Sequence, residues 1–165
     1  MKGKLITAIV AAGMVLGAFI IITHKPTAPE VRFMTLAGES IMTSQLRGKV
    51  VLVNFWATTC SVCLREMPQL AATHRYFAGQ GLETIAVAMD YAPPNRVKAY
   101  ADSKALPFKV ALDANGLVAR GFDNVRATPT TYLIDRRGEI VRRYLGAPDF
   151  TALQAQLADL LAQPG

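Results

Sequence analysis

The chain has 165 residues and a formal net charge of +6 at pH 7, which suits one folded domain with a short additional segment. Its two cysteines exclude a scaffold built on several disulfides, and its two histidines are too few for an obvious metal site. The only local cluster of basic residues lies between Arg136 and Arg143. We interpret it as solvated hairpin surface, and a nucleic-acid patch is the weaker alternative because no stacking aromatic residues accompany it.

The amino-terminal part of the chain predicts a membrane anchor. Lys2 and Lys4 precede Leu5–Ile22, an uncharged apolar run. A spanning helix needs about 20 apolar residues, whereas the apolar part of a signal peptide has only ~7–15, so the run favours a retained anchor. A cleaved signal peptide is the alternative, but the run is followed only by a poor cleavage site at Thr27-Ala28.

We therefore expect three parts: a single-pass anchor at 1–23, a short linker at 24–30 stiffened by two prolines, and a folded domain at 31–165. The lysines at the start favour a cytoplasmic amino terminus, although basic residues beyond the run weaken that signal. In a bacterium this topology places the anchor in the inner (cytoplasmic) membrane and the domain in the periplasm or its equivalent.

The first half of the domain predicts three strands and one helix. Short strands are expected within Val31–Leu36 and Ser40–Thr43, where apolar and polar residues alternate. Val50–Trp56 is an almost continuous apolar run, which is typical of a strand buried on both faces. Cys60–Phe77 carries its apolar residues at helical spacing.

The second half alternates strands with helices and ends in a hairpin and a helix. The expected strands are Thr84–Met89, Phe108–Leu112, Thr130–Ile134 and Glu139–Leu145. Helices are expected at 93–105 and after Pro148-Asp149, and 115–122 is expected to be a short helix or a turn. This order predicts an α/β fold with a mixed central sheet and helices on both faces.

The stretch most informative about chemistry lies where the buried strand Val50–Trp56 leads into the following helix. Cys60 and Cys63 are three residues apart at the start of that helix, so they share a face and lie within reach of a disulfide. The helix start carries partial positive charge and free N–H groups, which stabilise a thiolate at Cys60. Cys63, one turn further and more buried, then resolves the mixed disulfide by attacking Cys60. The spacing predicts a redox pair.

Three plainer interpretations compete with a redox pair. A structural disulfide that closes so short a loop constrains the unfolded chain little. Half of a zinc site needs two further ligands, and the sequence has no second cysteine pair. Two inert core thiols do not explain the placement at a strand-to-helix turn.

The chain resembles the thioredoxin superfamily, and within it the TlpA/ResA-type membrane-anchored thiol-disulfide oxidoreductases. The resemblance covers about 31–161, and it rests on Val-Asn-Phe-Trp-Ala at 53–57, Cys60-Ser-Val-Cys63, Glu66, Pro68, and Ala-Thr-Pro-Thr-Thr-Tyr-Leu-Ile-Asp at 127–135. It implies a thioredoxin-like fold with an amino-terminal β extension and a central βα insertion, the latter within 81–112.

The resemblance also implies an activity: exchange of the dithiol or disulfide with extracytoplasmic protein thiols, in the reducing direction and without a cofactor. The implied clients include apocytochrome c, as in cytochrome c maturation, and the implied electron source is a transmembrane donor of the DsbD or CcdA type. A peroxiredoxin is one alternative, but Val53 and Ala57 stand where its motif has Pro and Thr. A copper metallochaperone is another, but it needs a distal His, and none follows His74.

The same resemblance assigns roles around the pair. Thioredoxin itself has an Asp where Asn54 stands, and an amide cannot take up a proton; Glu66 matches the carboxylate that does related work in ResA-like proteins. From spacing alone, Glu66 is equally an ordinary solvated helix residue.

Pro129 matches the cis-proline that faces the active site in this superfamily, where the preceding backbone pairs with an extended client. We expect Trp56, Thr128 and Pro129 to contribute to client binding: Thr128 lines the client groove, and Trp56 packs beside the pair and shields it. Pro68 is expected to kink the helix, and the alternative is that the helix breaks there.

Overall fold

The computed structural model describes residues 25–163, so the predicted anchor at 1–23 lies outside the described residues. Within 25–163, no helix is both long and apolar enough to cross a membrane. The strands are β1 (Arg32–Thr35), β2 (Ser40–Met42), β3 (Val50–Trp56), β4 (Leu82–Ala88), β5 (Lys109–Leu112), β6 (Thr130–Ile134) and β7 (Ile140–Leu145). The helices are α2 (Ser61–Phe77), α3 (Pro94–Ser103), α4 (Leu117–Gly121) and α5 (Phe150–Ala162), with short 3₁₀ turns at Thr43–Leu46 and Ala78–Gln80.

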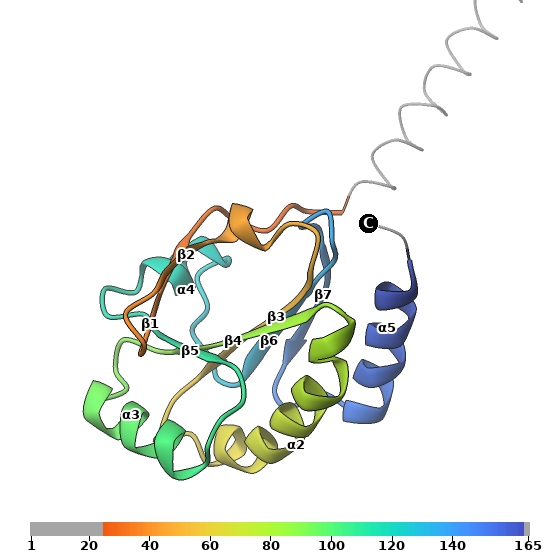
Figure 1. Ribbon diagram of the computed structural model, residues 1–165. Helices are drawn as coiled ribbons and strands as arrows, with labels where there is room; N and C mark the ends of the chain where they lie inside the picture. The colour runs from red at the N-terminus through yellow and green to blue at the C-terminus, as the bar shows by residue number, and fades with distance from the viewer. Residues whose placement is uncertain (1–24, 164–165) are drawn as a thin grey trace, which may run out of the picture.

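The strands form one mixed sheet in the order β2-β1-β5-β4-β3-β6-β7. β4 runs parallel to both β3 and β5, and the remaining neighbours are antiparallel. The buried strands β3 and β4 therefore lie near the middle of the sheet, as their continuous apolar runs predict. The hairpin β1–β2 extends one edge and β7 forms the other (Figure 1).

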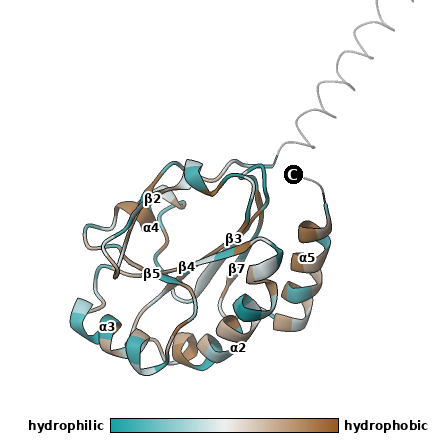
Figure 2. Ribbon diagram, in the orientation of Figure 1, coloured by the Kyte–Doolittle hydropathy of each residue, from teal (hydrophilic) through white to brown (hydrophobic). Residues whose placement is uncertain are grey.

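Alternate residues of the central strands face two separate hydrophobic clusters. On one face α2, α3 and α5 pack against the sheet, and their contributions include Met67, Leu70, Val97, Leu153 and Leu157. On the other face α4 and the turn that contains Leu46 cover the sheet together with Phe33, Phe55 and Phe122. Hydrophobic and hydrophilic residues alternate along α2 and α5, as expected of helices that bury one side (Figure 2).

The segment that we expected as a linker is attached to the sheet. The Ile140 N–H donates to the carbonyl of Pro26 at 2.7 Å, and the Ala28 N–H donates to the carbonyl of Gly138 at 2.8 Å. Thr27 thereby forms a β-bridge with Glu139. The described chain thus enters beside the β6–β7 turn, at the end of the sheet opposite to the start of α2 (Figure 1).

The predicted elements occur in the predicted order, with ends that differ by about two residues. β3 and β6 have the expected bounds, whereas β4 begins two residues earlier than expected, at Leu82. The helix does not break at Pro68: α2 continues through it to Phe77. A proline in the second turn or later removes one backbone hydrogen bond, and here the packing of the α2 face on the sheet maintains the helix.

Candidate active site

The two cysteines are joined by a disulfide at the amino terminus of α2, with their Cα atoms 5.3 Å apart. Cys60 is the N-cap residue: its backbone is extended, and its sulfur accepts a hydrogen bond from the Cys63 N–H at 3.2 Å. Cys60 is half-buried and Cys63 is fully buried. The sulfur that solvent can reach is therefore the one that lies at the positive end of the helix.

Thr128 and Pro129 lie directly beside the disulfide, although they are far from it in sequence. The Sγ atom of Cys60 is 3.5 Å from the carbonyl oxygen of Thr128. The Thr128–Pro129 peptide bond is cis, as the sequence motif predicted, and Pro129 is buried. The Tyr91 hydroxyl is 3.4 Å from Thr128 Oγ1, and Tyr91 itself is exposed. The start of β6 and the loop after β4 thus form the walls of the site next to Cys60.

Glu66 lies in the protein interior, on the face of α2 that packs against the sheet. Only 4% of its surface is exposed, which excludes the interpretation of Glu66 as a solvated helix residue. Its Oε1 atom accepts a hydrogen bond of 2.9 Å from Asn54 Nδ2, and among the described residues its Oε2 atom has no partner. Burial raises the pKa of Glu66 from an ordinary 4.5 to about 7, and the hydrogen bond from Asn54 offsets part of that rise.

Trp56 has no exposed surface and packs on Tyr100 of α3, with ring centroids 5.4 Å apart. The expected contribution of Trp56 to client binding stays a prediction. Because Trp56 is fully buried in the same hydrophobic cluster as Cys63, it can affect a client only through this packing. Thr128 and Pro129 are the predicted site residues that lie against Cys60, and Glu66 lies one turn further along α2 than Cys63.

Sequence reasoning missed the part that Asn54 plays. It donates to Glu66 and, through the same nitrogen, to Thr131 Oγ1 at 2.9 Å. The signal was present in the sequence: Asn54 is the one amide in the apolar run Val50–Trp56, and a buried polar side chain needs a hydrogen-bonding partner. The identity of those partners depends on strand pairing, which places Asn54 opposite Thr131.

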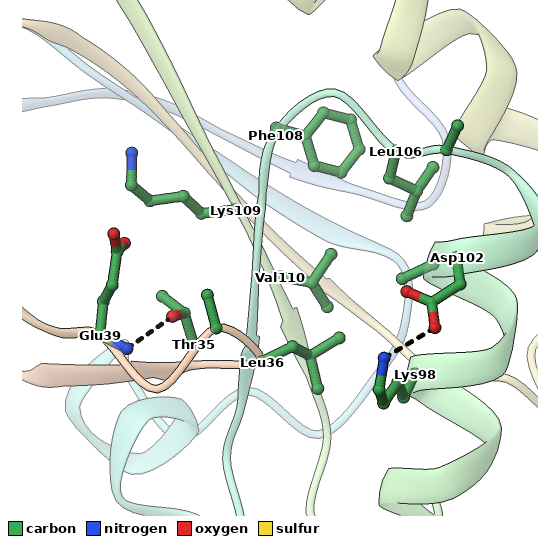
Figure 3. Close-up of a pocket in the computed structure, with 12 residues that line it drawn as sticks. Thr35, Leu36, Glu39, Lys98, Asp102, Leu106, Phe108, Lys109 and Val110 are labelled. Carbon is green, nitrogen blue, oxygen red and sulfur yellow. Dashed lines mark hydrogen bonds and ion pairs between the residues drawn. The ribbon is translucent and has the colours of Figure 1, made fainter.

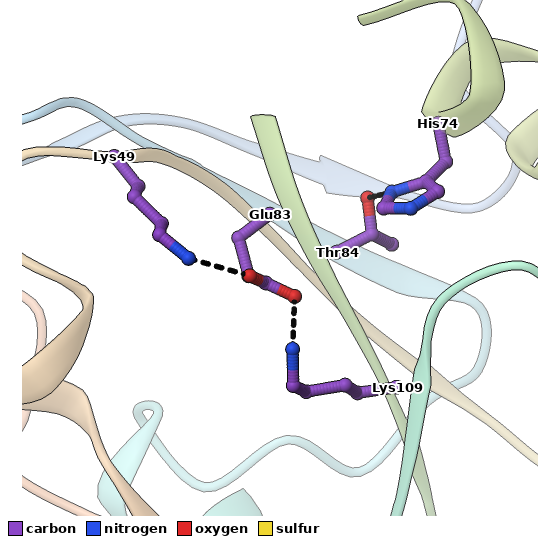
Figure 4. Close-up of polar contacts among 5 residues, drawn as sticks. All are labelled: Lys49, His74, Glu83, Thr84 and Lys109. Carbon is purple, nitrogen blue, oxygen red and sulfur yellow. Dashed lines mark hydrogen bonds and ion pairs between the residues drawn. The ribbon is translucent and has the colours of Figure 1, made fainter. Parts of the chain in front are cut away.

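A second polar cluster lies at the other end of α2, away from the disulfide (Figure 4). Glu83 accepts hydrogen bonds from Lys49 and Lys109, each at 2.9 Å. Burial raises the pKa of Glu83, but the two lysines outweigh that effect and the pKa is lowered overall. Nearby, His74 Nδ1 is 3.1 Å from Thr84 Oγ1, and the pKa of His74 is lowered, chiefly by burial.

A surface cavity of about 620 Å³ lies between α3, β5 and the β1–β2 turn (Figure 3). Leu36, Leu106, Phe108 and Val110 supply its apolar lining, and an exposed Lys98–Asp102 ion pair lies at its rim. None of the residues that line it belongs to the disulfide site. Among residues 25–163, no group of three or more His, Cys, Asp or Glu side chains has an arrangement that could hold a metal ion.

Comparison with known proteins places this site in a family. The Redoxin family model matches residues 24–159, which is most of the chain. The chain belongs to the Redoxin family. It is 40% identical over 111 residues to the thiol-disulfide oxidoreductase ResA of Halalkalibacterium halodurans, a match that covers 67% of this chain and 62% of that protein. It is 34% identical over 128 residues to ResA of Bacillus subtilis, with 76% and 69% covered.

A solved structure supports the same grouping. The thioredoxin domain of a thiol-disulfide oxidoreductase from Bacteroides vulgatus superposes with a TM-score of 0.70 at 26% identity, and the match covers 81% of this chain and 96% of that one. The fold is thioredoxin-like, as the sequence predicted. With its Cys60–Cys63 disulfide at a helix amino terminus, the chain is a thiol-disulfide oxidoreductase of the Redoxin family. It spans about two thirds of the length of the ResA relatives.

Proposed function

We propose that this protein reduces disulfides of extracytoplasmic protein clients. The observation that supports this most directly is the division of the pair: Cys60 is accessible beside Thr128, whereas Cys63 is fully buried on the same helix as Glu66. An accessible sulfur suits the attacking role. A buried sulfur with a nearby proton acceptor suits the resolving role.

In the first step the Cys60 thiolate attacks one sulfur of the client disulfide. A bond forms between Cys60 Sγ and that sulfur, the client disulfide breaks, and the second client sulfur leaves as a thiolate that takes a proton from water. The N–H groups at the start of α2 stabilise the Cys60 thiolate before the attack. The client chain lies extended along the Thr128 and Pro129 backbone, which borders Cys60.

In the second step Cys63 resolves the mixed disulfide. The Cys63 thiol gives its proton to the Glu66 carboxylate, and its sulfur attacks Cys60 Sγ. The Cys60–Cys63 bond forms, the mixed disulfide breaks, and the remaining client sulfur leaves as a thiolate and is then protonated. Two electrons have passed to the client. A proton acceptor whose pKa is near 7 suits this task at neutral pH.

We extend this proposal to the client protein and to the electron donor. Reduction of apocytochrome c cysteines in cytochrome c maturation fits the ResA relatives, and a transmembrane donor of the DsbD or CcdA type would restore the dithiol. Anchorage through residues 1–23, with the domain in the periplasm, brings the protein to such a donor. The point at which the described chain begins supports this geometry, because it lies at the end of the sheet opposite to Cys60.

The test is a measurement of reduction potential together with insulin reduction by the full-length protein. We expect a potential between about −200 and −300 mV and turnover that Cys60→Ser abolishes, as for reductants of this kind. A potential near about −120 mV, the value of a strong oxidant, would contradict the direction. Peroxide consumption that depends on Cys60 without insulin reduction would favour the peroxiredoxin alternative.

A further inference from the structure

Asn54 lies in an unusual position for an amide, on a central strand of the sheet and against Glu66 of α2. Its side chain is 1% exposed, and both of its hydrogen-bonding partners, Glu66 and Thr131, are also buried. These three residues come from β3, α2 and β6, the elements that also carry or border the reacting sulfurs. The α2 backbone sets the spacing of Glu66 and Cys63, and the Asn54 contact is the side-chain hydrogen bond that orients the Glu66 carboxyl group.

The hydrogen-bonding atoms of Asn54 and Glu66 that lack a partner suggest a second orientation of the Asn54 amide. Asn54 donates through Nδ2 to both Glu66 Oε1 and Thr131 Oγ1, which suits an ionised carboxylate. Among the described residues, Asn54 Oδ1 and Glu66 Oε2 have no partner. Protonation turns one oxygen of the carboxyl group into a donor, and a buried donor needs an acceptor. Asn54 Oδ1 is the acceptor of this group that lacks a partner among the described residues.

We propose that Asn54 and Thr131 are positioning residues that hold Glu66 in both of its protonation states, through a half-turn of the Asn54 amide. When Glu66 is ionised, the amide nitrogen faces it, as in this structure. When Glu66 has taken the proton of Cys63, the amide turns and Oδ1 accepts from the carboxyl group. The Thr131 hydroxyl permits both states, because it accepts from Nδ2 in one and donates to Oδ1 in the other. This inference rests on the role of Glu66 in the proposed function.

The residue types support this reading over a purely structural hydrogen bond. An Asp at 54 could not donate to an ionised Glu66, and an apolar residue could neither donate nor accept. Burial and the Asn54 hydrogen bond account for the pKa of Glu66, and no charged neighbour among residues 25–163 contributes to it. The amide is therefore the polar group that distinguishes the two states of the carboxyl.

The experiment compares Asn54→Leu and Thr131→Val with Thr84→Val in the full-length protein. Thr84 is a matched control, because it is a buried threonine on the neighbouring strand β4 and, among the described residues, its hydroxyl has His74 as its hydrogen-bonding partner. The first readout is the Glu66 carboxyl titration by NMR in the disulfide form, in which neither cysteine titrates. The second is the pH profile of insulin reduction, with kcat and KM separated.

We expect Asn54→Leu to move the Glu66 titration upward by at least one pH unit and to lower kcat near pH 7 with KM unchanged. Thr131→Val should move both in the same direction by less, and Thr84→Val should move neither. Superimposable titrations for wild type, Asn54→Leu and Thr131→Val would overturn the proposal. So would Asn54 side-chain amide protons whose NOE contacts with Thr131 stay unchanged through the Glu66 titration, because a half-turn moves Nδ2 away from Thr131. If instead Glu66→Gln leaves the pH profile of wild type intact, the proposed role of Glu66 fails, and the NMR titration still decides whether the amide holds the carboxyl.

Discussion

Two buried carboxylates divide this molecule into a reactive end and a structural end. Glu66 and Glu83 have similar exposed fractions, 4% and 9%, and both lie on elements that pack at the centre of the fold. Glu83 is held by two lysines, and its pKa is lowered. Glu66 has an amide as its partner, and its pKa is raised to about 7. Burial raises the pKa of both carboxylates. The two lysines beside Glu83 reverse that rise, whereas the described residues around Glu66 include no cation that does so.

The largest difference should appear in catalysis. We expect Glu66→Gln to slow insulin reduction at pH 7 by about 10- to 100-fold, because proton transfer by a placed side chain contributes factors of roughly 10²–10⁴. Glu83→Gln should stay within about twofold of wild type. The apparent thiol pKa values of the pair should fall in Glu66→Gln, because a nearby negative charge is removed. If Glu66→Gln and Glu83→Gln slowed insulin reduction equally, the distinction between a reactive and a structural carboxylate would be wrong.

The second difference is in the pH dependence of stability. The folded-state pKa of Glu66 is raised, so its stabilising contribution is fully present below about pH 4.5 and is lost as pH rises through about 7. Glu66→Gln should therefore leave the free energy of unfolding unchanged at pH 4 and increase it at pH 8, by about 1–3 kcal/mol. Urea unfolding at the two pH values measures this, and a loss of stability at pH 8 would contradict a buried charge at Glu66.

Glu83 should show the opposite dependence. Its pKa is lowered, so its contribution is present above the ordinary pKa of 4.5 and is lost as pH falls through the folded-state value. We expect Glu83→Gln to destabilise the protein at pH 7 by about 1–2 kcal/mol, because two lysines lose their shared partner, one of them half-exposed. Once the pH has fallen below the folded-state pKa of Glu83, the wild type and the variant should unfold at the same urea concentration, and a difference that persists there would contradict this assignment.

The smallest effect is expected at an exposed carboxylate. Asp102 pairs with Lys98 at 2.8 Å, but more than 60% of each side chain is exposed. Asp102→Asn should change the free energy of unfolding by about 0.5 kcal/mol or less and should not affect insulin reduction. If Asp102→Asn destabilised the protein as much as Glu83→Gln, an ion pair would contribute equally to stability whether it is exposed or buried, which would contradict this expectation.

The elements that frame the site could be predicted because their signals are local. The bounds of β3 follow from a run of six apolar residues interrupted only by Asn54, and α2 begins directly after Cys60, where the cysteine spacing predicted a helix start. The contacts inside the site could not be predicted. Asn54 meets Thr131 because β3 pairs with β6 in one register, and no local pattern specifies that register.

Dependence on strand pairing also explains why the sequence did not reveal the Glu83 cluster or the attachment of 24–30 to the sheet. Lys49 lies just before β3 and Lys109 begins β5. The order of the strands in the sheet brings both lysines to Glu83 of β4. The prolines of 24–30 suggested a separate linker, but the backbone of Pro26 and Ala28 pairs with the β6–β7 hairpin. Both are non-local contacts, and composition carries no information about them.

In the proposed mechanism Glu66 takes the proton of Cys63 when the mixed disulfide resolves, and the release of a coloured leaving group isolates that step. The Cys60 mixed disulfide with thionitrobenzoate is formed at low pH, and release of the yellow thiolate is followed after a jump to pH 6–9. We predict that release in wild type rises with an inflection near pH 7, that Glu83→Gln superimposes on it, and that Glu66→Gln is at least about tenfold slower at pH 7. Release at the wild-type rate in Glu66→Gln across this range would contradict the claim.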